Sequence, residues 1–305
     1  MDLNLLKTFR MVAATGNFTQ AASALNYAQS SVTAQIQTLE ADLGVRLFTR
    51  LPRKAVLTEA GARLLPSAER LLLLAEQTRS VVHEAEIPAG TLTLGAPDTL
   101  CTHWLPKIFR EYRRSHPQVR LVFRPTPVAD LRRLVREGVL DVAFVLEEPI
   151  RGGALNVETL ALIPLWVLAP PGHRLASARQ VRAQDLHGES ILLTELGCSY
   201  RNLFEHALIA AGAHPGPTLE FGAVETIKQC VMAGLGVTVL PSLAVAKEVA
   251  EGSLVVLPWT GGRLDVSNQM LWRPGSEAVP AVQAFLDLAR QEARNSTPPP
   301  GKDLP

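Results

Sequence analysis

Hydrophobic residues in the first part of the chain recur at the three- and four-residue spacing that is typical of helices. The spacing predicts a first helix around residues 6–13, a second that begins at a Thr19 cap, and a third that opens at Gln29 and Ser30 with a serine cap. The third helix carries a stripe that we expect to be buried: Val32, Ile36, Leu39 and Leu43. The pattern therefore predicts three short helices around one small core.

The opposite face of the third helix carries small hydroxyl and amide side chains in place of the lysines and glutamates of an ordinary solvated face. Its members are Ser30, Ser31, Ala34, Gln37 and Thr38, with Thr33 and Gln35 on the flanks. Hydroxyls and amides can donate and accept hydrogen bonds at base edges without filling a DNA groove. A small helical core with a merely solvated polar face is the alternative.

Basic residues cluster directly afterwards around a turn at Pro52, where a β-wing would bind phosphates. They are Arg46, Arg50, Arg53 and Lys54. The pattern favours DNA binding over the alternative, because two short helices joined by a tight turn occur together with a basic wing.

A long helix is expected from a Thr58 cap to about Ala85. Its wide apolar stripe consists of Leu64, Leu65, Ala68, Leu71, Leu72, Ala75, Val82 and Ala85. Leaving such leucines exposed costs about 1.5–3 kcal/mol each, so the stripe predicts pairing with another chain. The alternative is that this helix packs on the chain's own C-terminal domain.

Beyond residues 88–90, short strand-like runs alternate with helical patterns, which predicts a largely parallel, doubly wound α/β sheet in two lobes. Strands are expected in TLTLG, VRLVF and LDVAFVL of the first lobe and in PLWVLA, ESILLTE and TLEF of the second. The run VTVLP would return the chain to the crossover, and residues 254–257 and 268–273 would be strands of the first lobe. The helices are expected over residues 103–114, 129–137, 199–211, 224–233 and 279–294.

A chain of 305 residues is long enough for about two domains. The patterns above divide it further, into four segments. A winged helix-turn-helix domain is expected over residues 1–57, a dimerising linker helix over 58–87, an α/β domain over 88–294 and a disordered tail over 295–305. Within the α/β domain, lobe I covers about 88–161 and 241–294, and lobe II about 162–240.

Composition narrows the function classes. Thirty basic residues against 29 acidic ones give a net charge of +1, so a nucleic-acid surface must be local. We expect a cytoplasmic protein with no membrane span, because the chain has no apolar run of about 20 residues and no cleavable signal at its N-terminus. Three distant cysteines, Cys101, Cys198 and Cys230, suit a reducing compartment. No metal or other cofactor is expected, because no cysteine–histidine cluster has zinc-ligand spacing.

Three stretches of the sequence resemble the LysR-type transcriptional regulators. They are LLKTFRMVAATGNFTQAASALNYAQSSVTAQIQTLEADLGVRLFTR, RKAVLTEAGARLL and, much later, ETIKQCVMAGLGVTVLP. The resemblance implies a winged helix-turn-helix, a dimerising linker helix and a two-lobed effector domain similar to periplasmic solute-binding proteins. It also implies a homotetramer, built as a dimer of dimers, that binds double-stranded promoter DNA at an imperfect palindrome and contacts RNA polymerase.

The resemblance also implies which residues contact DNA. In the recognition helix these are Gln29, Ser30, Ser31, Thr33, Gln35 and Gln37, and the phosphate contacts are Thr19, Gln20, Arg50, Arg53 and Lys54. The chain departs from the family at two of its positions. Many members have proline where this chain has Ser30 and arginine where it has Ala34. Because arginine commonly reads guanine, we expect the base preference of this chain to differ from that of members that carry the arginine.

Ligands of open α/β sheets bind beyond the carboxyl ends of the strands, which selects loops of both lobes as the effector site. The candidates are Asp98, Thr99, Cys101, Thr102, Glu147, Cys198, Ser199, Arg201, Val224, Glu225 and Thr226. Several of these residues open helices, and helix N-termini together with an arginine attract anions. We therefore expect a small anionic metabolite as the effector.

Two candidates have a structural alternative. Ser199 could be a plain N-cap, and Arg201 could pair with an acid such as Glu195 or Glu205. Cys198 lies near the position where the family's peroxide sensors carry their reactive cysteine, so a one-cysteine redox switch is an alternative function. No second cysteine follows within the next ten residues, which excludes the usual local disulfide. Cys230 is expected to be a packing residue.

An enzyme that uses the same cleft is the rival from another class. The sequence contains no GxSxG, GxxxxGK[ST] or HExxH motif, and no GxGxxG that opens a helix. His103 is the one histidine in a candidate loop. A plain solute-binding protein would leave the N-terminal third unexplained. We therefore expect a regulator without catalytic residues.

Overall fold

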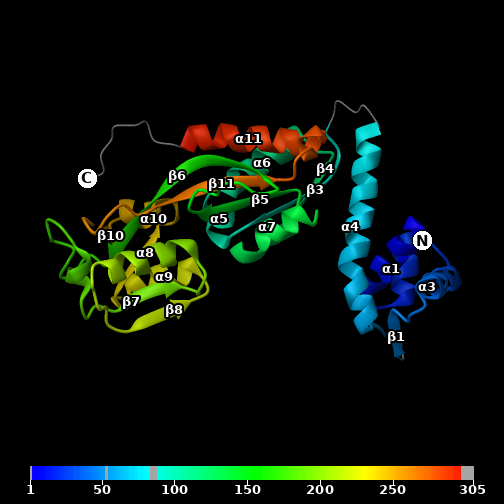
Figure 1. Cartoon of the computed structure of the whole chain (residues 1–305), viewed down its shortest axis with the longest axis horizontal. Helices are drawn as coiled ribbons and strands as arrows, with labels where there is room; N and C mark the ends of the chain where they lie inside the picture. Colours follow the sequence, from blue (N-terminus) through cyan, green and yellow to red (C-terminus); the bar gives the residue numbers. More distant parts are fainter. Residues whose placement is uncertain (1, 52–53, 83–87, 297–305) are drawn as a thin grey trace. The chain divides into compact units, whose positions relative to one another are not determined.

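A computed structural model describes residues 2–51, 54–82 and 88–296 of the chain (Figure 1). The chain folds into two compact units that divide near residue 85. No helix in the described part is long and apolar enough to cross a bilayer.

Three helices and a hairpin surround the core of the N-terminal unit. The helices are α1 (Leu3–Thr15), α2 (Phe18–Leu25) and α3 (Gln29–Leu43), and the hairpin pairs β1 (Phe48–Leu51) with β2 (Lys54–Leu57). Phe9 of α1 and Ile36 of α3 are buried, and the Phe48 ring packs on Phe9 with centroids 5.4 Å apart. The predicted helices therefore share one core.

The helix starts differ from the sequence prediction. Asn17, and not Thr19, caps α2: its Oδ1 accepts hydrogen bonds from the N–H groups of Thr19 at 2.8 Å and Gln20 at 3.2 Å. The capping oxygen must precede the first helical turn, and Thr19 lies inside it. Helix α3 likewise starts after Ala28, with no side-chain cap. Leu43, in the last turn of α3, is 38% exposed, so the buried stripe ends earlier than predicted.

Helix α4 (Glu59–Val82) begins as predicted, since the Thr58 hydroxyl accepts a hydrogen bond from the Gly61 N–H at 3.1 Å. Its apolar stripe is only partly open. Ala68 and Leu72 are buried in the core that α1 shares, whereas Leu71 and Leu74 are exposed. Part of the stripe expected to pair with another chain therefore packs within the N-terminal unit. The predicted stripe members Val82 and Ala85 fall outside the described side chains.

The C-terminal unit is built on one mixed sheet with the strand order β4-β3-β5-β11-β6-β9-β7-β8. Parallel strands form each end: β3 (Gly90–Ala96), β4 (Val119–Pro125) and β5 (Val142–Glu147) in lobe I, and β7 (Ile191–Thr194), β8 (Thr218–Phe221) and β9 (Val237–Pro241) in lobe II. Between them, β6 (Asn156–Ala169) and β11 (Asp265–Trp272) pair antiparallel. The two crossing strands thus join both lobes (Figure 1).

Helices cover the faces of both lobes. Lobe I carries α5 (Asp98–His103), α6 (Leu105–Ser115), α7 (Val128–Arg136) and α11 (Pro280–Ser296). Lobe II carries α8 (Ser199–Ala210), α9 (Val224–Met232) and α10 (Ser242–Ala250). Helix α11 is held on β6 by Arg290, whose guanidinium donates hydrogen bonds to the Glu158 carboxylate at 2.8 and 3.0 Å.

Four details correct the sequence prediction. The sheet is mixed, because β6 and β11 run against their neighbours. Strand β10 (Val255–Val256) pairs with the lobe II end of β6, so the chain returns to lobe I only with β11. The helix expected over residues 103–114 is two helices, which meet at the non-helical Trp104. Helix α11 continues through Ser296, two residues into the predicted tail, and residues 297–305 lie outside the described chain.

A buried carboxylate fixes the connection between α3 and the hairpin. Glu40 of α3 is 8% exposed, and its Oε1 accepts hydrogen bonds from the N–H groups of Leu47 at 2.7 Å and Phe48 at 3.3 Å. Arg46 lies 3.6 Å from its other oxygen. Because these N–H groups are buried at the start of the wing, they depend on this carboxylate for a partner.

Replacing Glu40 by alanine should destabilise the N-terminal unit by about 1–3 kcal/mol, since it leaves buried N–H groups without an acceptor. Glu40→Gln keeps one side-chain oxygen and should cost clearly less. Chemical unfolding of the two variants, followed by circular dichroism, measures the difference. Equal stability of Glu40→Ala and the unmodified protein would contradict the role given to Glu40.

Candidate functional site

The polar face of α3 is open to solvent, as the sequence predicts. Its exposed members are Gln29, Ser30, Ser31, Ala34, Gln37 and Thr38. Because α3 starts without a side-chain cap, the hydroxyls of Ser30 and Ser31 are not used to cap their own helix. The face therefore presents several hydrogen-bonding groups on the second helix of a helix-turn-helix.

The two residues on the flanks of α3, Thr33 and Gln35, are less exposed than those of its polar face. Gln35 accepts a hydrogen bond from the hydroxyl of the buried Thr8 at 2.5 Å, so its side-chain oxygen joins α1 to α3. Thr33 is half-buried. The contact with Thr8 uses only the side-chain oxygen of Gln35, and the base contact predicted for this residue stays a prediction.

Only some of the residues predicted to contact phosphate have side chains within the described part of the chain. Thr19 and Gln20 are exposed at the start of α2, and Lys54 is exposed at the start of β2. Arg50 lies in β1, but its side chain is outside the described residues, as is the whole of Arg53.

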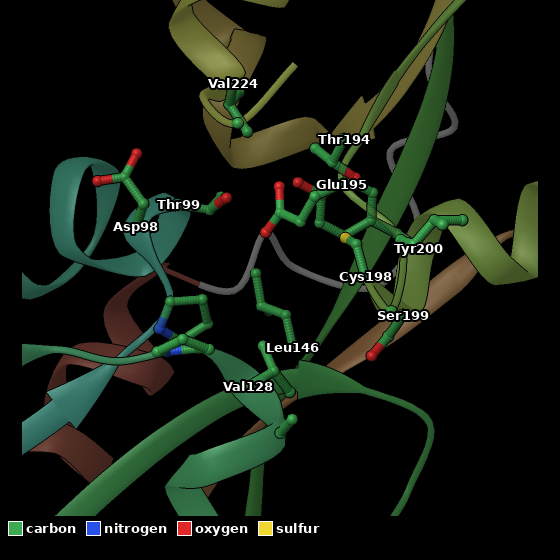
Figure 2. Close-up of a pocket in the computed structure, with 16 residues that line it drawn as sticks. Asp98, Thr99, Val128, Leu146, Thr194, Glu195, Cys198, Ser199, Tyr200 and Val224 are labelled. Atoms are coloured by element: carbon green, nitrogen blue, oxygen red, sulfur yellow. The ribbon is translucent and has the colours of Figure 1, made fainter. Parts of the chain in front are cut away.

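A pocket of about 160 Å³ lies between the two lobes of the C-terminal unit (Figure 2). Its wall consists of Pro97, Asp98, Thr99, Pro127, Val128, Ala129, Leu146, Thr194, Glu195, Leu196, Gly197, Cys198, Ser199, Tyr200, Gly222 and Val224. These residues follow the carboxyl ends of parallel strands in both lobes, which is the sheet edge that the sequence predicts.

Four helices of the two lobes begin at this pocket, and Asp98 opens the first of them, the short α5. Val128 opens α7, Ser199 opens α8 and Val224 opens α9. In α8 and α9, the N-cap residues Cys198 and Ala223 make no side-chain cap. The positive ends of these two helix dipoles therefore face the pocket region without a capping side chain.

Thr194, at the end of β7, has a hydroxyl that lines the pocket and lacks a partner. The side chain is 5% exposed, and its Oγ1 has no hydrogen bond to any described residue. A buried hydroxyl without a partner costs free energy. The arrangement is typical of a group that hydrogen-bonds a bound molecule.

Tyr200 links the lobes beside Thr194. Its side chain is buried in α8, and it interacts with Thr99 of α5 and with Cys198. Burial raises the pKa of Tyr200, and its interaction with Cys198 acts in the same direction. The hydroxyl is therefore protonated at neutral pH and can donate a hydrogen bond within the pocket.

The predicted effector role of Arg201 is not supported by its contacts. The side chain is 6% exposed and lies outside the pocket wall. Its guanidinium donates to the Thr194 carbonyl at 2.5 Å, to Glu220 at 2.7 Å and to Glu205 at 3.0 Å. The structural alternative, pairing with a nearby acid, therefore describes this residue, although the acids are Glu205 and Glu220 and not Glu195.

Five of the predicted effector residues line the pocket: Asp98, Thr99, Cys198, Ser199 and Val224. The others lie outside its wall: Cys101, Thr102, Glu147, Arg201, Glu225 and Thr226. Two of these acids are held in ion pairs, since Glu147 contacts Arg132 at 2.5 Å and Glu225 contacts Lys228 at 2.8 Å.

The Cys101 side chain is bonded to the backbone of its own segment. Its thiol donates to the Pro97 carbonyl at 3.0 Å, and burial together with the charge of Asp98 raises the pKa of Cys101 to about 12. Within the described residues, no cluster of histidine, cysteine, aspartate and glutamate side chains is placed to hold a metal ion.

The sequence prediction missed Thr194, Glu195 and the start of α7 at residues 127–129. Residues 127–129 follow strand β4, so the rule that selects loops after strands would have found them if it had been applied to that strand. Thr194 and Glu195 end the run ILLTE that the rule did select. No sequence signal distinguishes a free threonine hydroxyl from a bonded one.

Comparisons with known families cover nearly the whole chain. Residues 3–62 match the family described as bacterial regulatory helix-turn-helix protein, lysR family, and residues 85–294 match the LysR substrate binding domain. The chain is 39% identical over 292 residues to an HTH-type transcriptional regulator of Bacillus subtilis (strain 168), YwqM, and the match covers 95% of this chain and 99% of that protein.

Solved structures agree with this fold. A full-length OxyR variant from Pseudomonas aeruginosa has a TM-score of 0.73 and 25% identity, and the match covers 100% of this chain and 99% of that one. Full-length CbnR complexed with its target DNA has a TM-score of 0.68, and the match covers 96% of this chain and 100% of that one; its 24% identity shows the fold alone.

The chain belongs to the LysR family of bacterial regulatory helix-turn-helix proteins. It is a DNA-binding transcriptional regulator with a substrate-binding effector domain, and its relatives are regulators and not enzymes.

Replacing Thr194 by valine should raise the stability of the ligand-free C-terminal unit by about 1 kcal/mol, because a buried hydroxyl without a partner is replaced by a methyl group of similar size. Calorimetric unfolding of the full chain measures this. Thr238→Val is the matched control: Thr238 is buried in the same lobe, but its hydroxyl donates to the Leu192 carbonyl at 2.7 Å, so this variant should lose stability. Equal losses in both variants would show that Thr194 has a partner.

Proposed function

We propose that this regulator reads a specific promoter sequence with α3 and that a small effector, bound between the lobes, controls its output. The observation that carries the proposal is the exposed face of α3, which presents hydroxyls and amides to solvent on the second helix of a helix-turn-helix. A surface of this kind can read base edges in a major groove.

The proposed base contacts are Gln29, Ser30, Ser31 and Gln37, with Thr33 and Gln35 at the edges of the face. Thr19, Gln20 and Lys54, together with Arg50 and Arg53, would bind phosphates and fix the orientation of the helix. The chain's net charge of +1 supports local and not global attraction to DNA. Ala34, where many relatives carry arginine, leaves base reading to hydroxyls and amides.

For the effector, we propose a small molecule with a carboxylate or another anionic group. The uncapped starts of α8 and α9 and the free Thr194 hydroxyl support this, since helix N-termini attract negative charge. Ser199 and Thr99 would add hydrogen bonds. Binding would change the angle between the lobes and re-space paired recognition helices on DNA, for which a coupling of about 1–3 kcal/mol suffices.

The assembly we propose is a dimer of dimers that contacts RNA polymerase. Leu71 and Leu74 of α4, which are 38% and 58% exposed, are the observation that supports pairing through this helix. Exposed leucines on one helix face gain free energy when a second chain covers them.

A one-cysteine redox switch at Cys198 is the second candidate function. The thiol lines the pocket as the N-cap residue of α8, so a small oxidant that enters the pocket can reach it. The chain's cysteines are all free thiols.

DNA binding is tested by comparing Lys54→Ala with Gln29→Ala. Lys54→Ala should weaken binding to all duplexes alike and should reduce the slope of log affinity against log salt by about 1, because one phosphate contact is lost. Gln29→Ala should instead reduce the preference for the promoter over random duplex by about 1–3 kcal/mol. Fluorescence anisotropy over a salt series separates the two effects.

Lys247→Ala is the control, since this exposed lysine lies in the C-terminal unit. An unchanged salt slope in Lys54→Ala would remove Lys54 from the interface. If Gln29→Ala weakened binding to the promoter and to random duplex equally, the base contact proposed for Gln29 would be wrong.

The redox candidate is tested by labelling thiols before and after exposure to hydrogen peroxide. If Cys198 is the switch, peroxide should remove its labelling and change promoter affinity, and Cys198→Ser should abolish that change in affinity. Cys230→Ser is the control, because Cys230 of α9 packs against the hydrophobic core. Unchanged labelling at Cys198 would end this hypothesis.

A further inference from the structure

The charged side chains that line the pocket are all negative. Asp98 and Glu195 contribute carboxylates, and the described wall holds no lysine, arginine or histidine. Both acids are exposed, and neither carboxylate has a hydrogen-bond or ion-pair partner among the described residues. Figure 2 shows the Glu195 side chain reaching into the pocket between the lobes. A ligand therefore meets two unpaired carboxylates and no cationic side chain.

Two buried cations of lobe II, Arg201 and Lys228, are already neutralised. Arg201 is bonded to Glu205 and Glu220, and Lys228 contacts Glu248 at 2.6 Å and Glu225 at 2.8 Å. Since each of these buried cations has two acidic partners, neither offers a free charge to an incoming anion. A multiply charged anion would thus be repelled by Asp98 and Glu195 without compensation.

The pocket nevertheless has electropositive places in its wall, since α8 and α9 each begin there without a side-chain cap. Thr194, whose buried hydroxyl has no partner among the described residues, lines the same pocket. Backbone N–H groups at helix starts together with a hydroxyl suit a single carboxylate. The pocket therefore offers complementary places for one negative and one positive group.

Apart from the hydroxyls of Thr99, Ser199 and Tyr200, much of the remaining wall is apolar, and the space is small. Val128 and Leu146 of lobe I and Val224 of lobe II line it, and the volume is about 160 Å³. An apolar wall gains free energy from an apolar ligand group and disfavours a third charge. The size limits the ligand to a small molecule.

We propose that the effector is an α-amino acid with an uncharged side chain. Its carboxylate binds the Thr194 hydroxyl and an uncapped helix start, its ammonium group pairs with Glu195, and its side chain lies against Val128 and Leu146. The inference rests on the proposed function, because it takes this pocket as the effector site. A carboxylate without the ammonium group would leave Glu195 unpaired, and an amine without the carboxylate would leave Thr194 and the helix starts unused.

The test is isothermal titration of the full-length protein with each standard L-amino acid that has an uncharged side chain. The amino acid that binds is then compared with its 2-hydroxy acid, which lacks the ammonium group, and with its carboxamide, which lacks the carboxylate. We expect binding of at least one amino acid and at least tenfold weaker binding of both analogues. Glu195→Gln should weaken the amino acid at least tenfold and leave the 2-hydroxy acid unaffected.

Two further variants complete the design. Glu251→Gln, at an exposed acid after α10, is the matched control and should bind as the unmodified protein does. Ala129→Phe, at an exposed position of the pocket wall, should block the pocket and abolish binding. Promoter binding without ligand, measured by anisotropy, should be the same in Glu251→Gln as in the unmodified protein, because Glu251 lies outside the N-terminal unit and outside the pocket wall.

The outcomes separate this inference from the proposed function. If no amino acid binds, or if the 2-hydroxy acid binds as tightly as the amino acid, the amino-acid class is wrong. If the 2-hydroxy acid binds as tightly as the amino acid and Ala129→Phe abolishes its binding, the pocket is still the effector site, and the proposed function stands. If an amino acid binds equally to Ala129→Phe, the pocket is not the effector site, and both proposals fail.

Discussion

The pairing of β6 with β11 is the constraint on which the C-terminal unit depends. The strand β6 pairs with β11 as far as Pro164 and with β9 from Leu165, so one strand belongs to the sheets of both lobes. Because the lobes share these strands, the carboxyl ends of β3, β5 and β7 come to the same region, and helices that follow β3 and β7 begin there. The pocket is a consequence of this topology.

Recognition in the pocket is decided by which charges are already paired. Arg201 and Lys228 are cations of the kind that an anionic ligand would need, yet each is buried with two carboxylates. Buried charges require partners, so these arginine and lysine side chains stabilise lobe II. The groups left for a ligand are helix starts, the Thr194 hydroxyl and two acids. This is why the pocket favours a zwitterion over a simple anion.

In the N-terminal unit, the sequence predicted the helices but not which side chains bond to one another. The spacing of apolar residues predicted the helices and their shared core, because burial of a helix face requires that periodicity. It could not show that Gln35 bonds to Thr8, or that Asn17 and not Thr19 caps α2, since both depend on where neighbouring atoms lie. Likewise, part of the apolar stripe on α4 is buried in the core that it shares with α1, whereas Leu71 and Leu74 remain exposed.

The amino-acid sequence by itself determined the family, the two-unit organisation, the alternation of strands and helices, and the sheet edge where the pocket lies. These follow from local periodicity and from chain connectivity. Only the tertiary structure decided that β10 belongs to lobe II, that Arg201 is an internal ion-pair partner and that the Thr194 hydroxyl is free among the described residues. The physical reason is that hydrogen-bond satisfaction and charge pairing depend on atoms brought together from distant segments, which no local pattern records.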